Sequence, residues 1–116
     1  MNDRISSFEI EAERLNGACV VRVRGDLDLG THEQLGERLV AEADGGPLIV
    51  DLSECDFIDS SGIRALLLGM RANSEGAGLT IAAPTSQVQR ILEMTGLRGA
   101  IPVHASVEAA LAEATG

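Results

Sequence analysis

The sequence predicts an α/β fold, with a mixed and mostly parallel β-sheet of four to five strands and about four α-helices. Extended apolar segments alternate along the chain with segments of helical periodicity, the pattern of strands joined by helical crossovers. Residues 47–53 carry a continuous apolar run, as in a strand that is covered on both faces. Because such crossovers make the joined strands parallel, we expect residues 18–24, 47–53 and 79–83 to pair in parallel.

The chain is predicted to begin with a β-hairpin. Residues 8–15 and 18–24 have strand-like composition and flank Asn16-Gly17, a dipeptide typical of tight hairpin turns. Val21 and Val23 alternate with arginines, so one face of the second strand is expected to be partly solvated.

A loop over residues 25–30 is expected to lead into the first helix. Thr31 is predicted to begin this helix, with Gln34 completing a capping box. Residues 44–47, which include two glycines and a proline, are predicted to end it. Its buried stripe is expected to consist of Leu35, Leu39 and Val40.

Three more helices are expected in the remainder of the chain. The second follows Ser60, shows apolar residues at helical spacing and ends within residues 73–78. The third begins at residues 84–86 and ends at Gly96. Ser106 is expected to cap the fourth, after a short extended segment at residues 101–104. The residues expected to face the core are Ile63, Leu66, Leu67, Met70, Val88, Ile91, Leu92, Met94, Leu97, Val107, Ala110 and Leu111.

The composition limits the classes of partner. A chain of 116 residues fits a single domain over residues 1–116, with a core of about 8–113. The net charge of −9 argues against nucleic acid and anionic membranes as partners, because both require basic patches. No secretory signal or membrane-spanning run is apparent, so we expect a cytoplasmic protein. Cys19 and Cys55 have no metal or redox spacing, so we expect reduced thiols, no metal and no cofactor, with oxidation of Cys55 a weaker hypothesis.

The segment Asp59-Ser60-Ser61-Gly62 lies where a buried strand gives way to an apolar-periodic helix. Free backbone N–H groups and the helix dipole favour negative charge there, so a hydroxyl at this place can accept a phosphoryl group. The alternative is that these residues only cap the helix. One cap needs one side chain, whereas three polar residues and a glycine stand in a row, which favours a function.

Three stretches together resemble a known family. Gly25-Asp26-Leu27-Asp28, Phe57-Ile58-Asp59-Ser60-Ser61-Gly62-Ile63 and Met94-Thr95-Gly96-Leu97 resemble the signature stretches of STAS domains, above all those of bacterial anti-sigma factor antagonists. The match in order and spacing covers roughly residues 8–113. The resemblance implies a STAS-type fold.

The resemblance also implies a mechanism of regulation. In that family the first serine of the motif accepts a phosphoryl group from a serine kinase that is itself the anti-sigma factor, which implies Ser60 here. The unphosphorylated antagonist binds this kinase and frees the sigma factor, phosphorylation breaks the complex, and a serine phosphatase resets the switch. The residues expected to bind the partner are Asp26, Asp28, Asp59, Ser61, Gly62 and Arg64.

Several roles within this motif stay open. Asp28 either orients the Ser60 hydroxyl or contacts the kinase, or it is a loop carboxylate that suits the start of a helix. Ser61 is expected to cap the helix or satisfy the backbone rather than to act as a second acceptor. Arg64 departs from the family pattern, in which a smaller residue is common, and is expected to pair with acidic groups of the partner or with the phosphate.

Two other functions compete with this interpretation. A STAS domain can also be a non-switching scaffold or a transporter-associated subunit, but the complete motif with its acceptor serine favours the switch. An enzyme would require a nucleophilic triad such as Asp28, His32 and Ser60. No Gly-x-Ser-x-Gly elbow, phosphate loop or metal spacing supports catalysis, so we expect a kinase substrate and not an enzyme.

Overall fold

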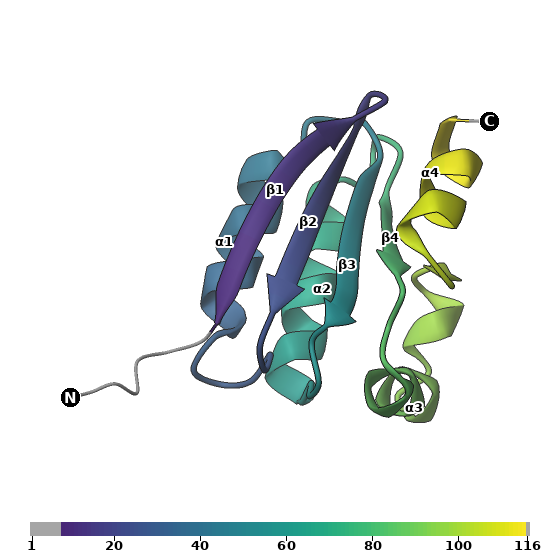
Figure 1. Ribbon diagram of the computed structural model, residues 1–116. Helices are drawn as coiled ribbons and strands as arrows, with labels where there is room; N and C mark the ends of the chain where they lie inside the picture. Colours follow the sequence, from purple (N-terminus) through teal and green to yellow (C-terminus); the bar gives the residue numbers. More distant parts are fainter. Residues whose placement is uncertain (1–7, 116) are drawn as a thin grey trace.

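The computed structural model describes residues 8–115 and contains a five-stranded sheet in the order β1-β2-β3-β4-β5 (Figure 1). The strands are β1 Glu9–Leu15, β2 Ala18–Arg24, β3 Leu48–Glu54, β4 Leu79–Ala82 and β5 Val103–His104. The helices are α1 His32–Glu42, α2 Ser60–Ala72, α3 Ser86–Met94 and α4 Val107–Thr115, and a short 3-10 turn spans Leu97–Gly99. The predicted α/β fold is confirmed.

The pairing of the strands also follows the prediction. β1 and β2 form an antiparallel hairpin, whereas β2, β3, β4 and β5 pair in parallel. Asn16 and Gly17 both have positive φ, 53° and 84°, as a tight turn between twisted strands requires. The carboxyl ends of β2, β3 and β4 therefore lie at one edge of the sheet.

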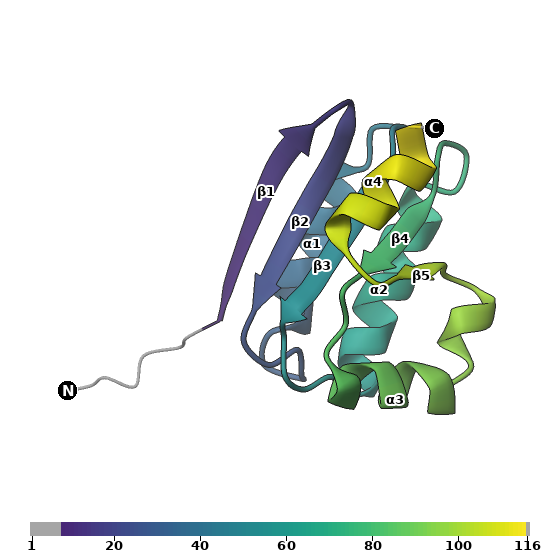
Figure 2. The same ribbon diagram turned by 45° about the vertical axis from the view of Figure 1, so that its right-hand side comes forward.

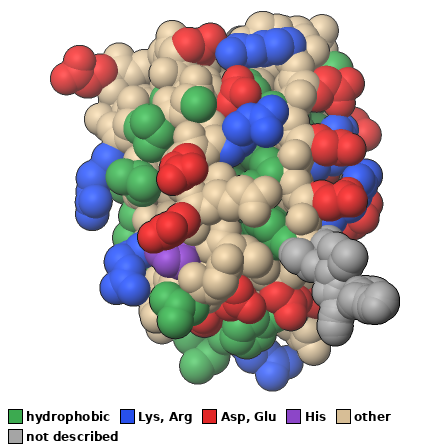
Figure 3. Space-filling model, turned by 90° about the vertical axis from the view of Figure 1, so that its left-hand side faces the viewer, with side chains coloured by type: hydrophobic (Ala, Val, Ile, Leu, Met, Phe, Trp, Pro, Cys, Tyr) green, Lys and Arg blue, Asp and Glu red, His purple; other side chains and the backbone are tan. Residues whose placement is uncertain are grey.

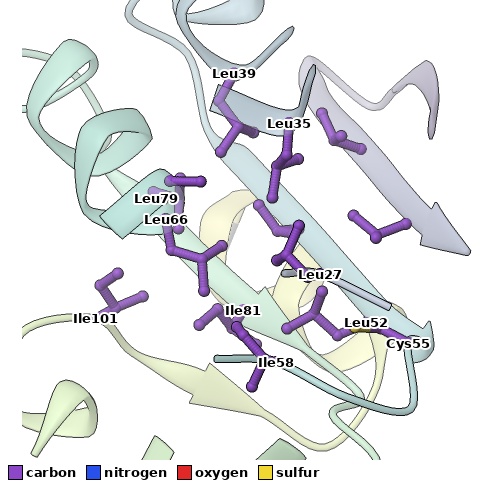
Figure 4. Packing of buried hydrophobic residues seen from close by; sticks show 14 of the residues in the cluster. Leu27, Leu35, Leu39, Leu52, Cys55, Ile58, Leu66, Leu79, Ile81 and Ile101 are labelled. Carbon is purple, nitrogen blue, oxygen red and sulfur yellow. The ribbon is translucent and has the colours of Figure 1, made fainter. Parts of the chain in front are cut away.

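Helices cover both faces of the sheet (Figure 2). The main core lies between the sheet and the α1–α2 layer and contains Leu35, Leu39 and Leu66 packed against Val21 and Val50. Figure 4 shows Leu35, Leu39 and Leu66 among the side chains of this core that converge from the helices and strands. A smaller cluster on the opposite face packs Ala110 of α4 against Val20 and Ile49. β3 is buried on both faces from Leu48 to Leu52, as its apolar run predicted.

The rest of that second face carries ion pairs instead of apolar side chains. Arg22 pairs with Glu13 of β1 at 2.8 Å, and Arg24 pairs with Glu54 of β3 at 3.0 Å. Arg24 also lies 3.4 Å from both Glu9 and Glu11. The predicted solvation of one face of β2 is confirmed, and the charges occupy the part of the sheet beyond α4.

Two expectations about α1 are wrong. Thr31 stands at its N-terminus, but its hydroxyl donates to the Asp26 carbonyl at 2.8 Å and accepts from the Asp28 N–H at 2.9 Å, so no capping box with Gln34 forms. The loop uses the oxygen that a capping box would need. Val40 is exposed, because only the part of the apolar face of α1 that carries Leu35 and Leu39 packs against the sheet.

One expectation about α3 is also wrong. Met94 is 75% exposed at the end of this helix, whereas Val88, Leu92 and Leu97 are buried. Gly96 follows in the left-handed conformation, with φ of 75°, and ends the helix as predicted. α3 begins within the predicted residues, with Thr85 as its N-cap accepting from the Val88 N–H, and the predicted cap of α4 is confirmed, since Ser106 accepts from the Ala109 N–H.

Candidate partner-binding site at the carboxyl ends of β2 and β3

The loops that follow β2 and β3 pair with each other beyond the ends of the strands. Leu27 and Ile58 form an isolated parallel bridge, and both side chains are buried. The Leu27 N–H donates to the Phe57 carbonyl at 2.9 Å, and the Asp59 N–H donates to the Leu27 carbonyl at 3.2 Å. Two sequence stretches thirty residues apart are thereby held side by side, as the predicted topology required.

Asp59 is the N-cap of α2. Its Oδ1 accepts hydrogen bonds from the Ser61 N–H at 2.8 Å and the Gly62 N–H at 3.2 Å. The expectation that Ser61 caps the helix or satisfies the backbone with its hydroxyl is wrong, because Ser61 is already inside the first turn and is buried. Within the described part of the chain its hydroxyl has no hydrogen-bond partner.

Ser60 is the first residue of α2 and is exposed. Its hydroxyl makes no hydrogen bond to any residue between 8 and 115. Asp59 already occupies the N–H groups of the first turn, so the Ser60 side chain is left facing solvent. Ser60 is therefore the hydroxyl of the motif that another molecule can reach.

Gly62 faces the interior, not an approaching partner. A Cβ atom at this position would lie 2.7 Å from Ile58 Cγ1 and 2.8 Å from both Leu27 Cγ and the Leu27 carbonyl oxygen. Such distances are far inside van der Waals contact, so only glycine lets α2 begin this close to the paired loops. Gly62 therefore has a packing role at the start of α2.

Asp28 is engaged within its own loop. Its Oδ1 accepts from the Gly30 N–H at 3.0 Å and lies 3.2 Å from the Thr31 hydroxyl oxygen. The His32 N–H donates to the Asp28 carbonyl at 2.9 Å, but no side-chain hydrogen bond connects Asp28, His32 and Ser60 in the described residues, so the hypothetical triad is not formed. Asp28 is thus a loop carboxylate at the start of α1 with no hydrogen bond to Ser60 among residues 8–115, and its contact with a kinase stays a prediction.

The surface around Ser60 is acidic. Asp26 and Asp56 are exposed on the two paired loops, and Asp59 is partly exposed. Arg64 lies one turn beyond Ser60 on α2, is exposed and has no ion pair with any residue between 8 and 115. An incoming group therefore meets mostly negative charge and one available guanidinium.

Two apolar side chains project from the same loops. Phe57 is 48% exposed and Leu29 is 74% exposed, although the core elsewhere buries its leucines almost completely. The sequence interpretation did not include either as a contact residue. The sequence does point to Phe57 as a candidate contact residue, since it is one of only two aromatic residues in the chain and directly precedes Ile58-Asp59-Ser60. Exposed apolar groups beside polar ones are typical of protein-binding surfaces.

Cys55 holds the loop after β3 in place from the buried side. Its side chain is fully buried, and its thiol donates to the Phe57 carbonyl at 3.3 Å. Burial raises the pKa of the thiol to about 11. Thr85 at the start of α3 donates its hydroxyl to the Cys55 carbonyl at 3.2 Å, which ties this loop to the third loop at the same edge. A buried, protonated thiol is a poor target for oxidation, which argues against the redox hypothesis.

The described residues contain neither a candidate metal cluster nor a membrane-spanning helix. No group of three or more histidine, cysteine or acidic side chains in residues 8–115 is arranged to hold a metal ion. No helix in that range is long and apolar enough to cross a bilayer. The site is a set of exposed side chains on paired loops and the first turn of α2.

The sequence matches a family model described as the STAS domain over residues 9–110. The chain belongs to the STAS domain family. This STAS domain is similar to an anti-sigma factor antagonist from Mycobacterium paratuberculosis, with a TM-score of 0.86 and 26% identity over 95% of this chain and 96% of that one. An anti-sigma F factor antagonist of Paenibacillus polymyxa is 26% identical over 92% of this chain and 95% of its own.

A third relative has been solved in two states. The anti-sigma factor antagonist SpoIIAA in its unphosphorylated form has a TM-score of 0.72 and 25% identity over 90% of this STAS domain and 93% of its own chain. SpoIIAA, a Bacillus cell fate determinant, has also been solved in a phosphorylated form, with a TM-score of 0.65 and 23% identity over 92% of this chain and 98% of that one. The resemblance inferred from the three sequence stretches is thereby confirmed.

Proposed function

We propose that this STAS domain is an anti-sigma factor antagonist whose unphosphorylated form binds a cognate anti-sigma serine kinase and releases the sigma factor. Phosphorylation at Ser60 switches that binding off, and a serine phosphatase restores it. One observation carries the proposal. Of the four motif residues, Asp59 caps α2, Ser61 and Gly62 are buried, and Ser60 alone presents an exposed hydroxyl with no partner among residues 8–115.

The chemistry requires nothing of this chain but an accessible oxygen. The Ser60 Oγ attacks the γ-phosphorus of ATP bound to the kinase, the bond from that phosphorus to ADP breaks, and the hydroxyl proton passes to a base of the kinase. The phosphatase then directs water to the same phosphorus, which returns the serine and releases inorganic phosphate. The domain is a substrate in both steps.

The charge of the phosphate explains the switch. A phosphoserine adds about −1.5 to −2 charges at neutral pH. The carboxylate of Asp59 already caps the first turn of α2, and Asp26 and Asp56 are exposed, one on each of the two paired loops. The new negative charge therefore meets like charges. Arg64 is the available cation on the first turns of α2. We expect exclusion of the partner by charge and bulk, with little change of fold.

The proposed partner-binding residues divide by exposure. Asp26, Ser60 and Arg64 are exposed and make direct contacts, joined by the apolar side chains of Phe57 and Leu29. The remaining residues proposed from the sequence act by shaping this surface: Asp28 through its loop, and Asp59, Ser61 and Gly62 through the start of α2.

The test is affinity capture from a lysate of the source cells in ADP and Mg²⁺. Wild type, Ser60→Ala, Ser60→Asp and Ser86→Asp serve as baits. Ser86 is a matched control, because it is also the exposed first residue of a capped helix. We expect all baits except Ser60→Asp to capture a small ATP-binding kinase. Equal capture of scaffold or transporter subunits by every bait would contradict the proposal.

A second measurement addresses the phosphorylated state itself. The captured kinase with ATP should add one phosphoryl group to wild type and none to Ser60→Ala, as read by intact mass. Backbone amide NMR shifts should then change within residues 26–31 and 55–64 and stay constant across the core strands. Widespread shifts in β1 to β4 would refute a switch that acts at the surface.

A further inference from the structure

A groove separates α1 from α2 on the side of these helices that faces away from the sheet. It has a volume of about 750 Å³. Buried small residues form part of its floor, Gly36 of α1 and Ala65 of α2, and Ala41 of α1 also lines it. Val40 and Leu68 line it and are both nearly half exposed, which is unusual in a chain that buries most of its aliphatic residues.

Gly36 leaves room for Leu68 at the junction of the two helices. A Cβ atom at Gly36 would lie 3.2 Å from Leu68 Cδ2, so the bare backbone of α1 lets the end of this side chain pack against it. Leu68 therefore lies across the helix junction with 45% of its surface exposed. The floor of the groove is apolar and is formed by packed helices, not by a loop.

The two walls of the groove carry opposite charges. Glu33 and Glu37 line the α1 wall, and Arg64 and Arg71 line the α2 wall. All four side chains are exposed, and none has an ion pair with any residue of the described chain. Figure 3 shows this side of the molecule, where hydrophobic side chains lie between acidic ones on one side and basic ones on the other.

The lack of ion pairs at the groove is a local property. Eight arginines fall within residues 8–115, and five of them form ion pairs: Arg14, Arg22, Arg24, Arg38 and Arg98. Two of the other three, Arg64 and Arg71, stand on the same wall of this groove. The walls thus hold unpaired charges of opposite sign on either side of an apolar floor.

We propose that this groove binds an amphipathic helix of a protein partner. The apolar stripe of that helix lies on the floor, basic side chains line the flank that faces α1, and acidic side chains line the flank that faces α2. Two neighbouring helices form a groove that suits a third helix. The apolar side chains with which such a helix binds recur at positions i, i+3, i+4 and i+7. The opposite charges of the walls fix which way the guest helix points.

The same features disfavour other occupants. Nucleic acids and anionic membranes are repelled by the acidic wall and by the net charge of −9. A second copy of this chain would present the same hollow, and two concave surfaces leave a cavity between them instead of filling it. A convex helix fills the volume, and its charged side chains can form ion pairs with the residues of both walls. The inference stands independently of the proposed phosphorylation of Ser60.

The test uses synthetic helical peptides as probes. The first peptide has about four turns, with leucines along one stripe, lysines on one flank and glutamates on the other. The second has the same composition and the same leucine stripe, but lysine and glutamate alternate on both flanks. Simple exchange of the flanks is no control, because a helix that binds in the reverse direction restores the match. Fluorescence anisotropy with the full-length domain gives both affinities.

Protein variants locate the binding surface. Leu68→Glu alters the floor and Arg71→Glu alters the basic wall, and each should weaken the first peptide by about tenfold or more. Met94→Glu and Arg90→Glu are matched controls on α3, since Met94 is 75% exposed and Arg90 is exposed and unpaired in the described chain. These two should bind the first peptide as wild type does.

Three results would overturn the proposal. The first is equal affinity for both peptides, and the second is an equal loss in the α3 controls. The third comes from sedimentation equilibrium: a dimer that Leu68→Glu dissociates would mean that a second copy occupies the groove. Circular dichroism melts accompany every variant, so that a loss of binding is compared only between folded proteins.

Discussion

Leu27 and Ile58 lie beside each other as a parallel bridge, and the start of α2 rests against both of them through a residue that has no side chain. The three segments that form the candidate site are therefore one packed unit. Main-chain hydrogen bonds join the two loops, and close packing joins both loops to the helix.

Gly62→Ala should destabilise the protein through this contact. The added methyl group would meet Ile58 and Leu27 atoms at 2.7 to 2.8 Å, one of them a backbone oxygen that cannot move away easily. We expect a loss of roughly 1–3 kcal/mol in the free energy of unfolding. Urea denaturation measures it, with Gly99→Ala as the control, because a Cβ there meets nothing within 4 Å. Equal losses in both variants would show that the packing argument fails.

Asp59→Ala should remove the cap of α2. The Ser61 and Gly62 N–H groups lose their acceptor, and we expect the free energy of unfolding to fall by about 1 kcal/mol. Asp56→Ala is the matched control, since it removes a nearby carboxylate that makes no hydrogen bond in the described chain. An unchanged stability in Asp59→Ala would argue that solvent caps the helix equally well.

The buried thiol of Cys55 should make stability depend on alkaline pH. Its pKa is about 11 in the folded protein, against an ordinary value of about 8.5 for an unfolded chain. Above the ordinary value the unfolded chain loses the proton first, so stability is fully present below about pH 8.5 and declines as the pH rises through 11.

The size of this decline can be measured against a variant. We expect wild type to lose roughly 2–3 kcal/mol more than Cys55→Ala over that range. The difference between the two isolates Cys55, because burial also raises the pKa of Cys19, and that residue is present in both proteins. Parallel pH profiles for the two proteins would mean that the Cys55 thiol is not shielded from water.

Phe57→Ala should weaken the proposed partner complex without unfolding the domain. Its ring is 48% exposed, so truncation removes little from the core but takes an aromatic anchor from the loops beside Ser60. Titration calorimetry with the captured partner should show a loss of about tenfold or more in affinity. Met94→Ala, an exposed apolar residue on α3, should bind as wild type does.

Much of the fold was predictable because its signals are local. The apolar run of β3, the Asn16-Gly17 turn and the glycine after α3 each depend on a few neighbouring residues, and the structure confirms them. Parallel pairing of β2 and β3 places the two motif loops at one edge of the sheet. The Leu27–Ile58 bridge is the consequence of that topology.

The errors arise where several partners compete for one group. Thr31 has a hydroxyl that suits a capping box, but the loop before it takes the same oxygen. Helical periodicity predicts which side of a helix is apolar but not how far burial extends around it, so Val40 is exposed against expectation. Met94 is exposed too, because only Leu97 packs inward beside Gly96. The closeness of Gly62 to Leu27 depends on tertiary packing, which no spacing in the sequence encodes.

Both borders of the sheet are unsuited to recruiting further strands. β5 is only two residues long, and β1 carries Glu9, Glu11 and Glu13 along the outer strand of the hairpin. Charged or very short outer strands discourage edge-to-edge growth between molecules. Aggregation through added β-strands is thereby disfavoured at both edges of the sheet. Other proteins therefore bind through the helices and the loops around Ser60.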